Sequence, residues 1–375
     1  MTAERSLVVV GTFADEMCRH IENAANEVGL STAFVGRCDD APLALAGVDA
    51  VAIILRMDAS GAAETCAHVR AQARLTQVPI LGAPPERNDL AFTEIFSWGG
   101  DDLIGRTIER ALVRRLRPLV ARPPGEPKRR DGFALVAGSD ARWRRVIGRA
   151  LYQGGFSVRF VATGEDLSKE LAIDGARVVV VEDALMPDGP VPVLAAARDA
   201  RSQAAWIVVA PPKRMATIHA AIAPFGPNTV ADGYAPPENV LFLTNELLSR
   251  RGVDQRATPR VLYGTAVAFR AAGREEDEIG FSYNVSGGGV YVRTLDPIDA
   301  GQEVWLEMWP PRSERRVRLA GVVAWKRAFG PSDGATVPSG FGVKVTDGLA
   351  GDLARWESGY RAFADSVLGS PAGVR

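Results

Sequence analysis

The chain has 375 residues, a length typical of two or three domains of about 100–200 residues each. Apolar residues make up 47% of the sequence and charged residues 24%, as in ordinary globular proteins with hydrophobic cores. The formal net charge of −1 argues against a nucleic-acid-binding protein that depends on a basic surface.

The N-terminal residues do not resemble a signal peptide, because a short apolar run is followed by acidic residues. No stretch reaches the roughly 20 apolar residues that a membrane-spanning helix needs. Cys18, Cys38 and Cys66 are odd in number, which fits free thiols in a reducing cytosol. The histidines have no ligand-like spacing. We therefore expect a cytoplasmic protein with no membrane insertion, no metal site and no cofactor.

Residues 6–117 are predicted to alternate between strands and helices. Residues 7–10 form a continuous apolar run, as in a parallel strand that is buried on both faces. Residues 15–28 have helical spacing. Further strands are expected at residues 32–35, 51–55 and 78–81, and further helices at residues 62–75 and 101–116.

This pattern repeats at an offset of 127 residues, which carries Gly11 onto Gly138. The same offset carries Ala-Pro-Pro at residues 83–85 onto Ala-Pro-Pro at residues 210–212, without a gap. The alignment indicates an internal duplication. Alternating strands and helices of this length predict two doubly wound parallel-sheet domains of flavodoxin-like fold.

Residues 180–189 resemble the third strand and following loop of response-regulator receiver domains. In that family an aspartate four residues before a proline accepts a phosphoryl group, and Asp183 holds this position. The chemistry also needs an acidic pair that holds Mg²⁺, and a lysine after the fifth strand. Ala137 and Gly138 stand at the positions of the acids here, and Pro236 stands at the position of the lysine.

The first copy departs further from the receiver pattern, since Arg56 occupies the position that Asp183 holds in the second. Two interpretations of Asp183 remain, a phosphoacceptor or a strand-end carboxylate that caps a loop. We favour the second, because the residues that would activate the carboxylate are missing. Both copies then resemble pseudo-receivers that serve as docking or dimerisation surfaces.

After a helix predicted at residues 238–249, the pattern becomes strand-like. Short runs separated by turn signals predict a small antiparallel barrel. The predicted strands are residues 261–269, 278–284, 289–294, 303–309, 316–325 and 341–345. Apolar residues at helical spacing then predict an amphipathic helix at 352–367, which we expect to pack across the mouth of the barrel.

Two polar runs lie at the start of this region. Arg256 and Arg260 are four residues apart beside a proline, which predicts an extended arm. Their planar guanidinium groups suit a phosphate or the acceptor edge of a guanine. The second run contains Asn284 and Ser286, which offer short polar side chains, and Gly289, which permits close approach of the backbone.

In order, these runs match RxxxR followed by [D/N]xSxxG, and resemble the signature of the PilZ domain, the bacterial receptor module for cyclic di-GMP. The resemblance covers roughly the last third of the chain. It implies that Arg256 and Arg260 grip guanine and phosphate, that Asn284 and Ser286 read another guanine edge, and that Gly289 gives the ligand room. The alternative is a solvated basic linker followed by an ordinary hairpin turn.

The sequence therefore predicts three domains with one linker. These are a pseudo-receiver at residues 1–120, a proline-rich linker at 121–131, a second pseudo-receiver at 132–250 and a PilZ domain at 251–375.

The leading hypothesis is a non-enzymatic cyclic di-GMP receptor. Ligand would order the arginine arm and re-orient the receiver-like domains, which would signal to a protein partner or self-associate. The output would be motility, pili, exopolysaccharide or gene regulation, without nucleic acid or membrane as a partner. The alternatives are a ligand-independent scaffold and a phosphorelay regulator that uses Asp183. An enzyme is least supported, since no nucleophile–base pair, metal cluster or phosphate loop is visible.

Overall fold

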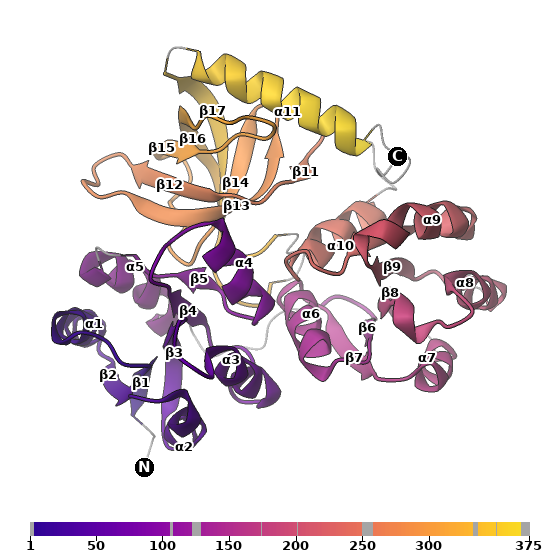
Figure 1. The fold of residues 1–375 in the computed structure, drawn as a ribbon, viewed down its shortest axis with the longest axis horizontal. Helices are drawn as coiled ribbons and strands as arrows, with labels where there is room; N and C mark the ends of the chain where they lie inside the picture. The colour runs from indigo at the N-terminus through magenta and orange to yellow at the C-terminus, as the bar shows by residue number, and fades with distance from the viewer. Residues whose placement is uncertain are drawn as a thin grey trace. The chain divides into compact units, whose positions relative to one another are not determined.

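The computed structural model describes residues 4–105, 108–121, 129–173, 175–200, 202–249, 258–332, 337–349 and 351–368 (Figure 1). These residues form two five-stranded parallel sheets with helices, one antiparallel barrel and a C-terminal helix, so the predicted fold class is confirmed. The chain divides into two compact units: the first contains the first sheet and the barrel, and the second contains the second sheet.

The first sheet has the strand order β2-β1-β3-β4-β5 and is parallel throughout. This is the flavodoxin-like order. Its strands are β1 (Arg5–Val10), β2 (Ser31–Val35), β3 (Asp49–Arg56), β4 (Ile80–Ala83) and β5 (Asp102–Leu103). Its helices are α1 (Asp15–Glu27), α2 (Ala41–Ala46), α3 (Ala62–Ala71), α4 (Asp89–Ser97) and α5 (Ile108–Val120).

Helices cover both faces of this sheet. Side chains of α2, α3 and α4 pack on one face, and those of α1 and α5 pack on the other. The apolar run of β1 is therefore fully buried, as predicted: Leu7, Val8, Val9 and Val10 are each 0% exposed. The predicted helix at 101–116 was wrong at its start, because Asp102 and Leu103 pair with β4 as strand β5.

The second sheet has the order β7-β6-β8-β9-β10, which repeats the order of the first sheet and agrees with the predicted duplication. Its strands are β6 (Phe133–Ala137), β7 (Ser157–Val161), β8 (Ala176–Glu182), β9 (Ala205–Ala210) and β10 (Asn228–Asp232). Its helices are α6 (Ala141–Gln153), α7 (Gly164–Leu171), α8 (Pro190–Asp199), α9 (Pro212–Ile222) and α10 (Asn239–Ser249). Helices α6 and α10 cover one face, and α7, α8 and α9 cover the other.

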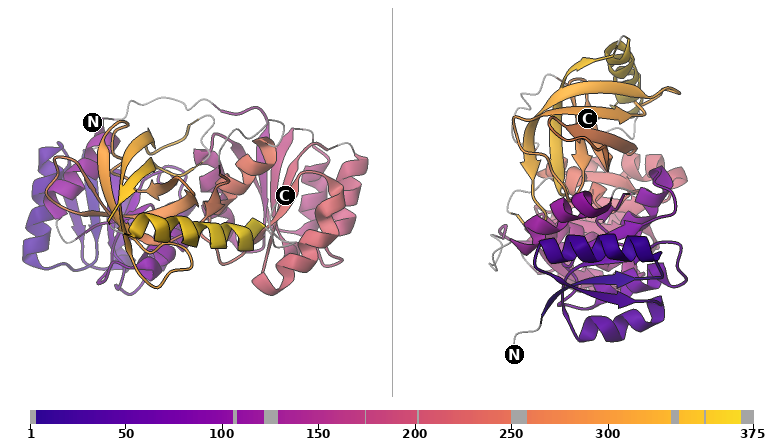
Figure 2. Two further views of the ribbon diagram at one scale, coloured as in Figure 1. Left: turned by 90° about the horizontal axis from the view of Figure 1, so that it is seen from above. Right: turned by 90° about the vertical axis from the view of Figure 1, so that its left-hand side faces the viewer.

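The barrel is a closed ring of antiparallel strands in the order β13-β12-β15-β16-β17-β14, completed by the pairing of β13 with β14. A short additional strand, β11, pairs with β13. The strands are β11 (Val261–Leu262), β12 (Ala266–Ala271), β13 (Glu278–Ser286), β14 (Gly289–Arg293), β15 (Glu303–Met308), β16 (Val317–Arg327) and β17 (Gly340–Gly348). Figure 2 shows the barrel strands in orange from two further sides.

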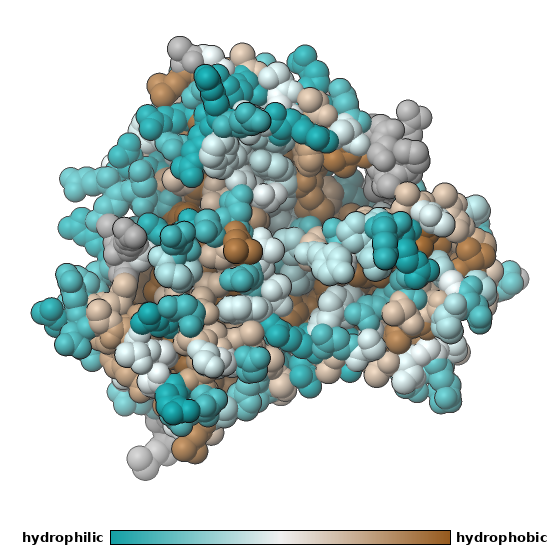
Figure 3. All heavy atoms as spheres, viewed as in Figure 1, coloured by the Kyte–Doolittle hydropathy of each residue, from teal (hydrophilic) through white to brown (hydrophobic). Residues whose placement is uncertain are grey.

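Helix α11 (Asp352–Leu368) follows the barrel, and the centre of its predicted apolar stripe is buried. Trp356 is 0% exposed and Tyr360 is 5% exposed. A β-carbon at Gly359 would lie 2.4 Å from the carbonyl oxygen of Pro311, so the missing side chain allows the helix to approach the loop after β15. Among the described helices, none is long and apolar enough to cross a membrane. On the face drawn in Figure 3, hydrophilic residues are interspersed with small apolar groups.

A buried network of charges joins the first sheet to the barrel. Arg115 of α5 donates to Asp102 of β5 and to Glu278 of β13, each at 3.0 Å. Asp102 also accepts hydrogen bonds from the Thr294 hydroxyl at 3.0 Å and from the Leu295 amide at 2.8 Å. The side chains of the three charged residues are no more than 4% exposed. Each charge is thus compensated by partners within the network, as buried charges require.

Aromatic rings extend the same interface. Phe92 and Phe96 of α4 lie 5.1 and 5.6 Å from the ring of Phe281 on β13. The guanidinium of Arg293 lies over the ring of Phe96. Apolar burial and charge pairing therefore act on the same pair of surfaces, and the first sheet is fixed to the barrel.

We expect Arg115→Ala to destabilise the first unit by about 3–5 kcal/mol, because Asp102 and Glu278 would stay buried without this partner. The matched control is Arg117→Ala, two residues further along α5, where an exposed ion pair with Glu27 contributes about 0–1 kcal/mol. Urea unfolding of the full chain measures both. Equal losses in the two variants would contradict this account of the interface.

Candidate functional site

Four of the predicted ligand residues line one pocket of the barrel, with a volume of about 150 Å³. They are Arg260, Asn284, Ser286 and Gly289. Trp325 of β16 and Lys344 of β17 line the same pocket. Arg256, the other predicted ligand residue, lies outside the described residues.

Strand pairing brings the two motifs together. Leu262 of β11 is opposite Asn284 of β13, and Val261 is opposite Val285. Continuing this register places Arg260 beside Ser286. On the other edge of β13, Ser286 is opposite Gly289, and the Ser286 hydroxyl donates to the Gly289 carbonyl at 3.4 Å. Residues that are separated in the sequence thus meet where β11, β13 and β14 come together.

A register shift in the β13–β14 ladder, between Ser282 and Asn284, precedes the motif. Such a bulge inserts an extra residue and changes the direction of the side chains that follow. Asn284 is 4% exposed and lines the pocket. The bulge therefore helps to set which motif side chains face the pocket.

Gly289 has a structural reason to be glycine. A β-carbon there would lie 2.3 Å from the carbonyl oxygen of Val343 on β17, whereas a β-carbon at Gly288 would meet no atom within 4 Å. The close approach of β14 to β17 therefore explains why residue 289 is glycine. The room for ligand that the motif implies at Gly289 would be an additional role.

An aromatic pair lies beside the motif residues. The rings of Tyr291 and Trp325 are stacked with their centroids 4.9 Å apart. Burial raises the pKa of Tyr291, so this hydroxyl stays protonated. A β-carbon at Gly342 would lie 2.7 Å from the indole nitrogen of Trp325, so this glycine makes space for the ring. The motif search missed Trp325 and Lys344, because their relation to the pocket depends on strand pairing.

This set of groups suits a phosphorylated molecule with a planar base. Arg260 and Lys344 supply positive charge, and guanidinium binds phosphate or guanine in a bidentate manner. Asn284 and Ser286 provide both donors and acceptors. The indole of Trp325 offers a flat surface of the kind on which bases stack. Among the described residues, no group of three His, Cys, Asp or Glu side chains could hold a metal ion.

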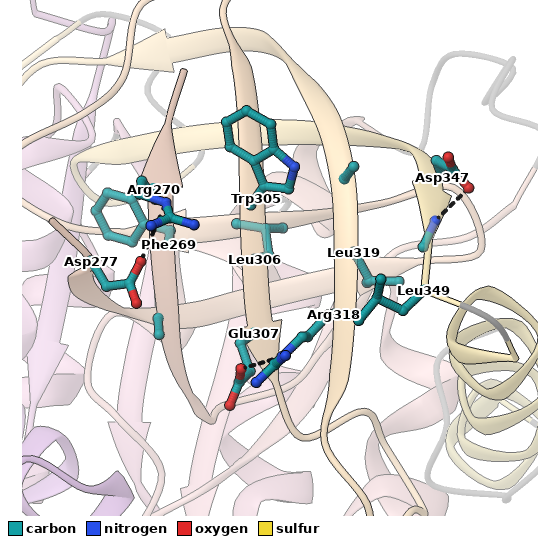
Figure 4. A pocket seen from close by; sticks show the side chains of 13 residues that line it. Phe269, Arg270, Asp277, Trp305, Leu306, Glu307, Arg318, Leu319, Asp347 and Leu349 are labelled. Carbon is teal, nitrogen blue, oxygen red and sulfur yellow. Dashed lines mark hydrogen bonds and ion pairs between the residues drawn. The ribbon is translucent and has the colours of Figure 1, made fainter. Parts of the chain in front are cut away.

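A larger groove, of about 450 Å³, lies on the barrel over β12, β15, β16 and β17 (Figure 4). Trp305 is 46% exposed there. The charges around it pair with each other: Arg318 donates to Glu307 at 2.8 Å and holds the pKa of that carboxyl below its usual value. The smaller pocket combines cationic, amide, hydroxyl and aromatic side chains, and so has the more suitable chemistry for such a molecule.

Asp183 lies directly after β8, at the start of a short 3₁₀ helix, η2 (Asp183–Leu185). Its side chain is 3% exposed, and Arg214 of α9 lies 2.5 Å from one carboxylate oxygen. The neighbouring Glu182 accepts a hydrogen bond from the Ser139 amide at 2.8 Å. A guanidinium thus neutralises the carboxylate, which supports a structural role for Asp183.

In the first sheet, Arg56 lies at the corresponding strand end and bonds to Asp58 through two nitrogens, at 2.8 and 3.0 Å. These bonds hold the pKa of Asp58 below its usual value. An arginine–carboxylate pair therefore occupies the strand end in both sheets.

We expect acetyl phosphate and Mg²⁺ to leave the full chain unmodified, because Arg214 neutralises Asp183 and the metal-binding acids are missing. Intact-mass spectrometry, with Asp183→Asn as the matched control, measures this. An acid-labile phosphate on the wild type that is absent from the control would contradict the structural role.

We also expect Gly289→Ala to destabilise the barrel by about 1–3 kcal/mol, since the new methyl group would overlap the backbone of β17. Gly288→Ala, one residue away and in open space, should change the free energy of unfolding by no more than about 0.5 kcal/mol. Urea unfolding compares the two. If both variants were as stable as the wild type, the claim that close packing of β14 on β17 requires a glycine at residue 289 would be contradicted.

The C-terminal region matches a family model described as the PilZ domain, over residues 254–356. No curated protein matches the chain.

Several solved structures are similar to parts of the chain. The inhibitor of motility from Bacillus subtilis is 20% identical, with 32% of this chain and 54% of that structure covered and a TM-score of 0.26. The match thus spans about half of that structure. A putative two-component response regulator/GGDEF domain protein is 15% identical, with 65% and 98% covered and a TM-score of 0.32. A putative response regulator from Chloroflexus aurantiacus is 19% identical, with 32% and 100% covered and a TM-score of 0.29. Because these scores are low, the fold assignment depends on the strand orders instead.

Proposed function

We propose that this chain, whose residues 254–356 form a PilZ domain, is a non-enzymatic receptor for cyclic di-GMP. The family match agrees with the resemblance predicted from the two motifs. The observation that carries the proposal is that Arg260, Asn284 and Ser286 line one pocket inside the matched region. A pocket that combines cationic, amide, hydroxyl and aromatic groups suits this ligand's phosphates and guanines.

Within this proposal, each motif residue has a separate role. Arg260, together with Arg256, grips guanine and phosphate with charge-assisted hydrogen bonds. Asn284 and Ser286 bond to the edge of a second guanine, and Trp325 offers a stacking surface. Ligand binding then depends on the position of the arm relative to β13.

The signal would pass from the pocket to the receiver-like domains, for which we keep the proposed bounds of residues 1–120 and 132–250. Since Arg115 joins the first sheet to the barrel by buried ion pairs, we expect these two to move together. The arginine arm follows α10 of the second sheet in the sequence. We therefore propose that ligand alters the second receiver-like domain and its contact with a protein partner in the cytoplasm. Motility, pili, exopolysaccharide and gene regulation are the candidate outputs.

A ligand-independent scaffold is the second candidate. One observation favours it: the strand-end position used for phosphorylation holds Arg56 in one sheet and an Asp183–Arg214 pair in the other. In this second candidate function, both receiver-like folds would serve as contact surfaces. Capture of the same protein partner with and without cyclic di-GMP would favour the scaffold.

We expect the full chain to bind cyclic di-GMP in titration calorimetry, and Arg260→Ala to weaken binding by about 10–100-fold, as loss of a charge-assisted contact predicts. The matched control is Arg318→Ala, an exposed arginine of the same barrel that lines the other groove. Its affinity should match the wild type within about twofold, since it contacts no part of the proposed site.

Absence of binding by the wild type would refute the proposed function. Undiminished binding by Arg260→Ala would show that the nucleotide binds elsewhere.

A further inference from the structure

We propose that Asp89, at the start of α4 in the first sheet, is a positioning residue for the arginine side of the ligand pocket. The predicted effect on nucleotide affinity rests on the proposed function. The predicted effect on amide exchange at Ala266 does not rest on it.

The segment that needs positioning is residues 260–266. Strand β11 forms only two residue pairs with β13, through Val261 and Leu262. A ladder of two pairs supplies few backbone hydrogen bonds to hold the segment. The direction of Arg260 therefore depends on how the residues after β11 are held.

Ser282 of β13 holds the first side of this segment. Its hydroxyl donates to the Tyr263 carbonyl at 2.7 Å and accepts from the Thr265 amide at 2.9 Å. The Ser282 amide donates to the Thr265 carbonyl at 2.8 Å. Between them, a β-carbon at Gly264 would lie 2.7 Å from the ring of Phe281, so the turn sits against this ring.

Asp89 holds the other side, from helix α4, which packs on the first parallel sheet. Its carboxylate accepts from the Ala266 amide at 2.6 Å and from the Thr265 hydroxyl at 3.2 Å. Burial and the charge of Asp89 together raise the pKa of Tyr263 to about 12. The carboxylate thus holds two neighbouring residues of the segment, through a side-chain hydroxyl and a backbone amide.

The position of Asp89 is itself fixed. The preceding Asn88 caps α4 by accepting from the Ala91 amide at 3.0 Å. Phe92, one turn further along α4, packs against Phe281 of β13. Since β13 also carries Asn284 and Ser286, the helix that bears Asp89 packs against the strand that bears two of the pocket residues. By this argument the first receiver-like domain helps to shape the ligand site. The Arg56–Asp58 pair at its strand end gives no sign of this role.

The test compares Asp89→Ala, Asp89→Asn and Glu94→Ala in the full chain. Glu94 is an exposed carboxylate on the same helix and serves as the control. Asp89→Ala should weaken cyclic di-GMP binding by about fivefold. Asp89→Asn should stay within about twofold of the wild type, because its amide oxygen can still accept from Ala266. Without ligand, amide hydrogen exchange at Ala266 should be faster in Asp89→Ala than in Glu94→Ala.

Unchanged exchange at Ala266 in Asp89→Ala would overturn the inference, whether or not nucleotide binds. Wild-type affinity in Asp89→Ala would also overturn it. An equal loss of affinity in Asp89→Asn would point to a general effect of the substitution and count against positioning. Failure of the wild type to bind would instead refute the proposed function. The exchange measurement would still decide whether Asp89 holds the segment of residues 260–266.

Discussion

The buried contact of Arg115 with Asp102 and Glu278 is the constraint on which the first unit depends. Charges this deeply buried are stable only with their partners, so separation of the sheet from the barrel would expose or orphan them. The same contact orders β5, which has only two residues and ends the sheet. It also joins α5 to β13, while Phe92 and Phe96 of α4 pack against the same strand. Strand β13 carries Glu278 of this network as well as Asn284 and Ser286 of the pocket. The network therefore helps to position both the interface and the pocket.

The layers of the fold could be predicted from the sequence, but this interface could not. Uniform apolar strands and helical spacing are local signals, and the repeat from Gly11 to Gly138 reinforced them. Asp102 and Arg115, in contrast, have the pattern of an ordinary amphipathic helix with solvated charges, which is why a helix was predicted from residue 101. Their burial depends on Glu278, far along the chain. Charges acquire this role only when a second domain covers them.

The residues that line the candidate pocket could be predicted only in part. Asn284, Ser286 and Gly289 are close in sequence, and their match to the PilZ signature selected them. Trp325, Lys344 and Asp89 reach the same region through strand pairing or from another sheet, which leaves no mark in local spacing. The motif identified Gly289, but it did not indicate the close packing against β17, which gives this position a second reason to be glycine.

The pairing of β11 has one more consequence. Strands β12 and β11 occupy the same edge of β13 in succession, with Phe281 opposite Ala266 and Val285 opposite Val261. A fragment that began at β12 would keep the ring but leave the edge at Asn284 and Val285 unpaired. Open edges recruit other strands. Strand β11 thus also covers this edge of β13, and we expect a barrel fragment to stay monomeric only if it includes β11.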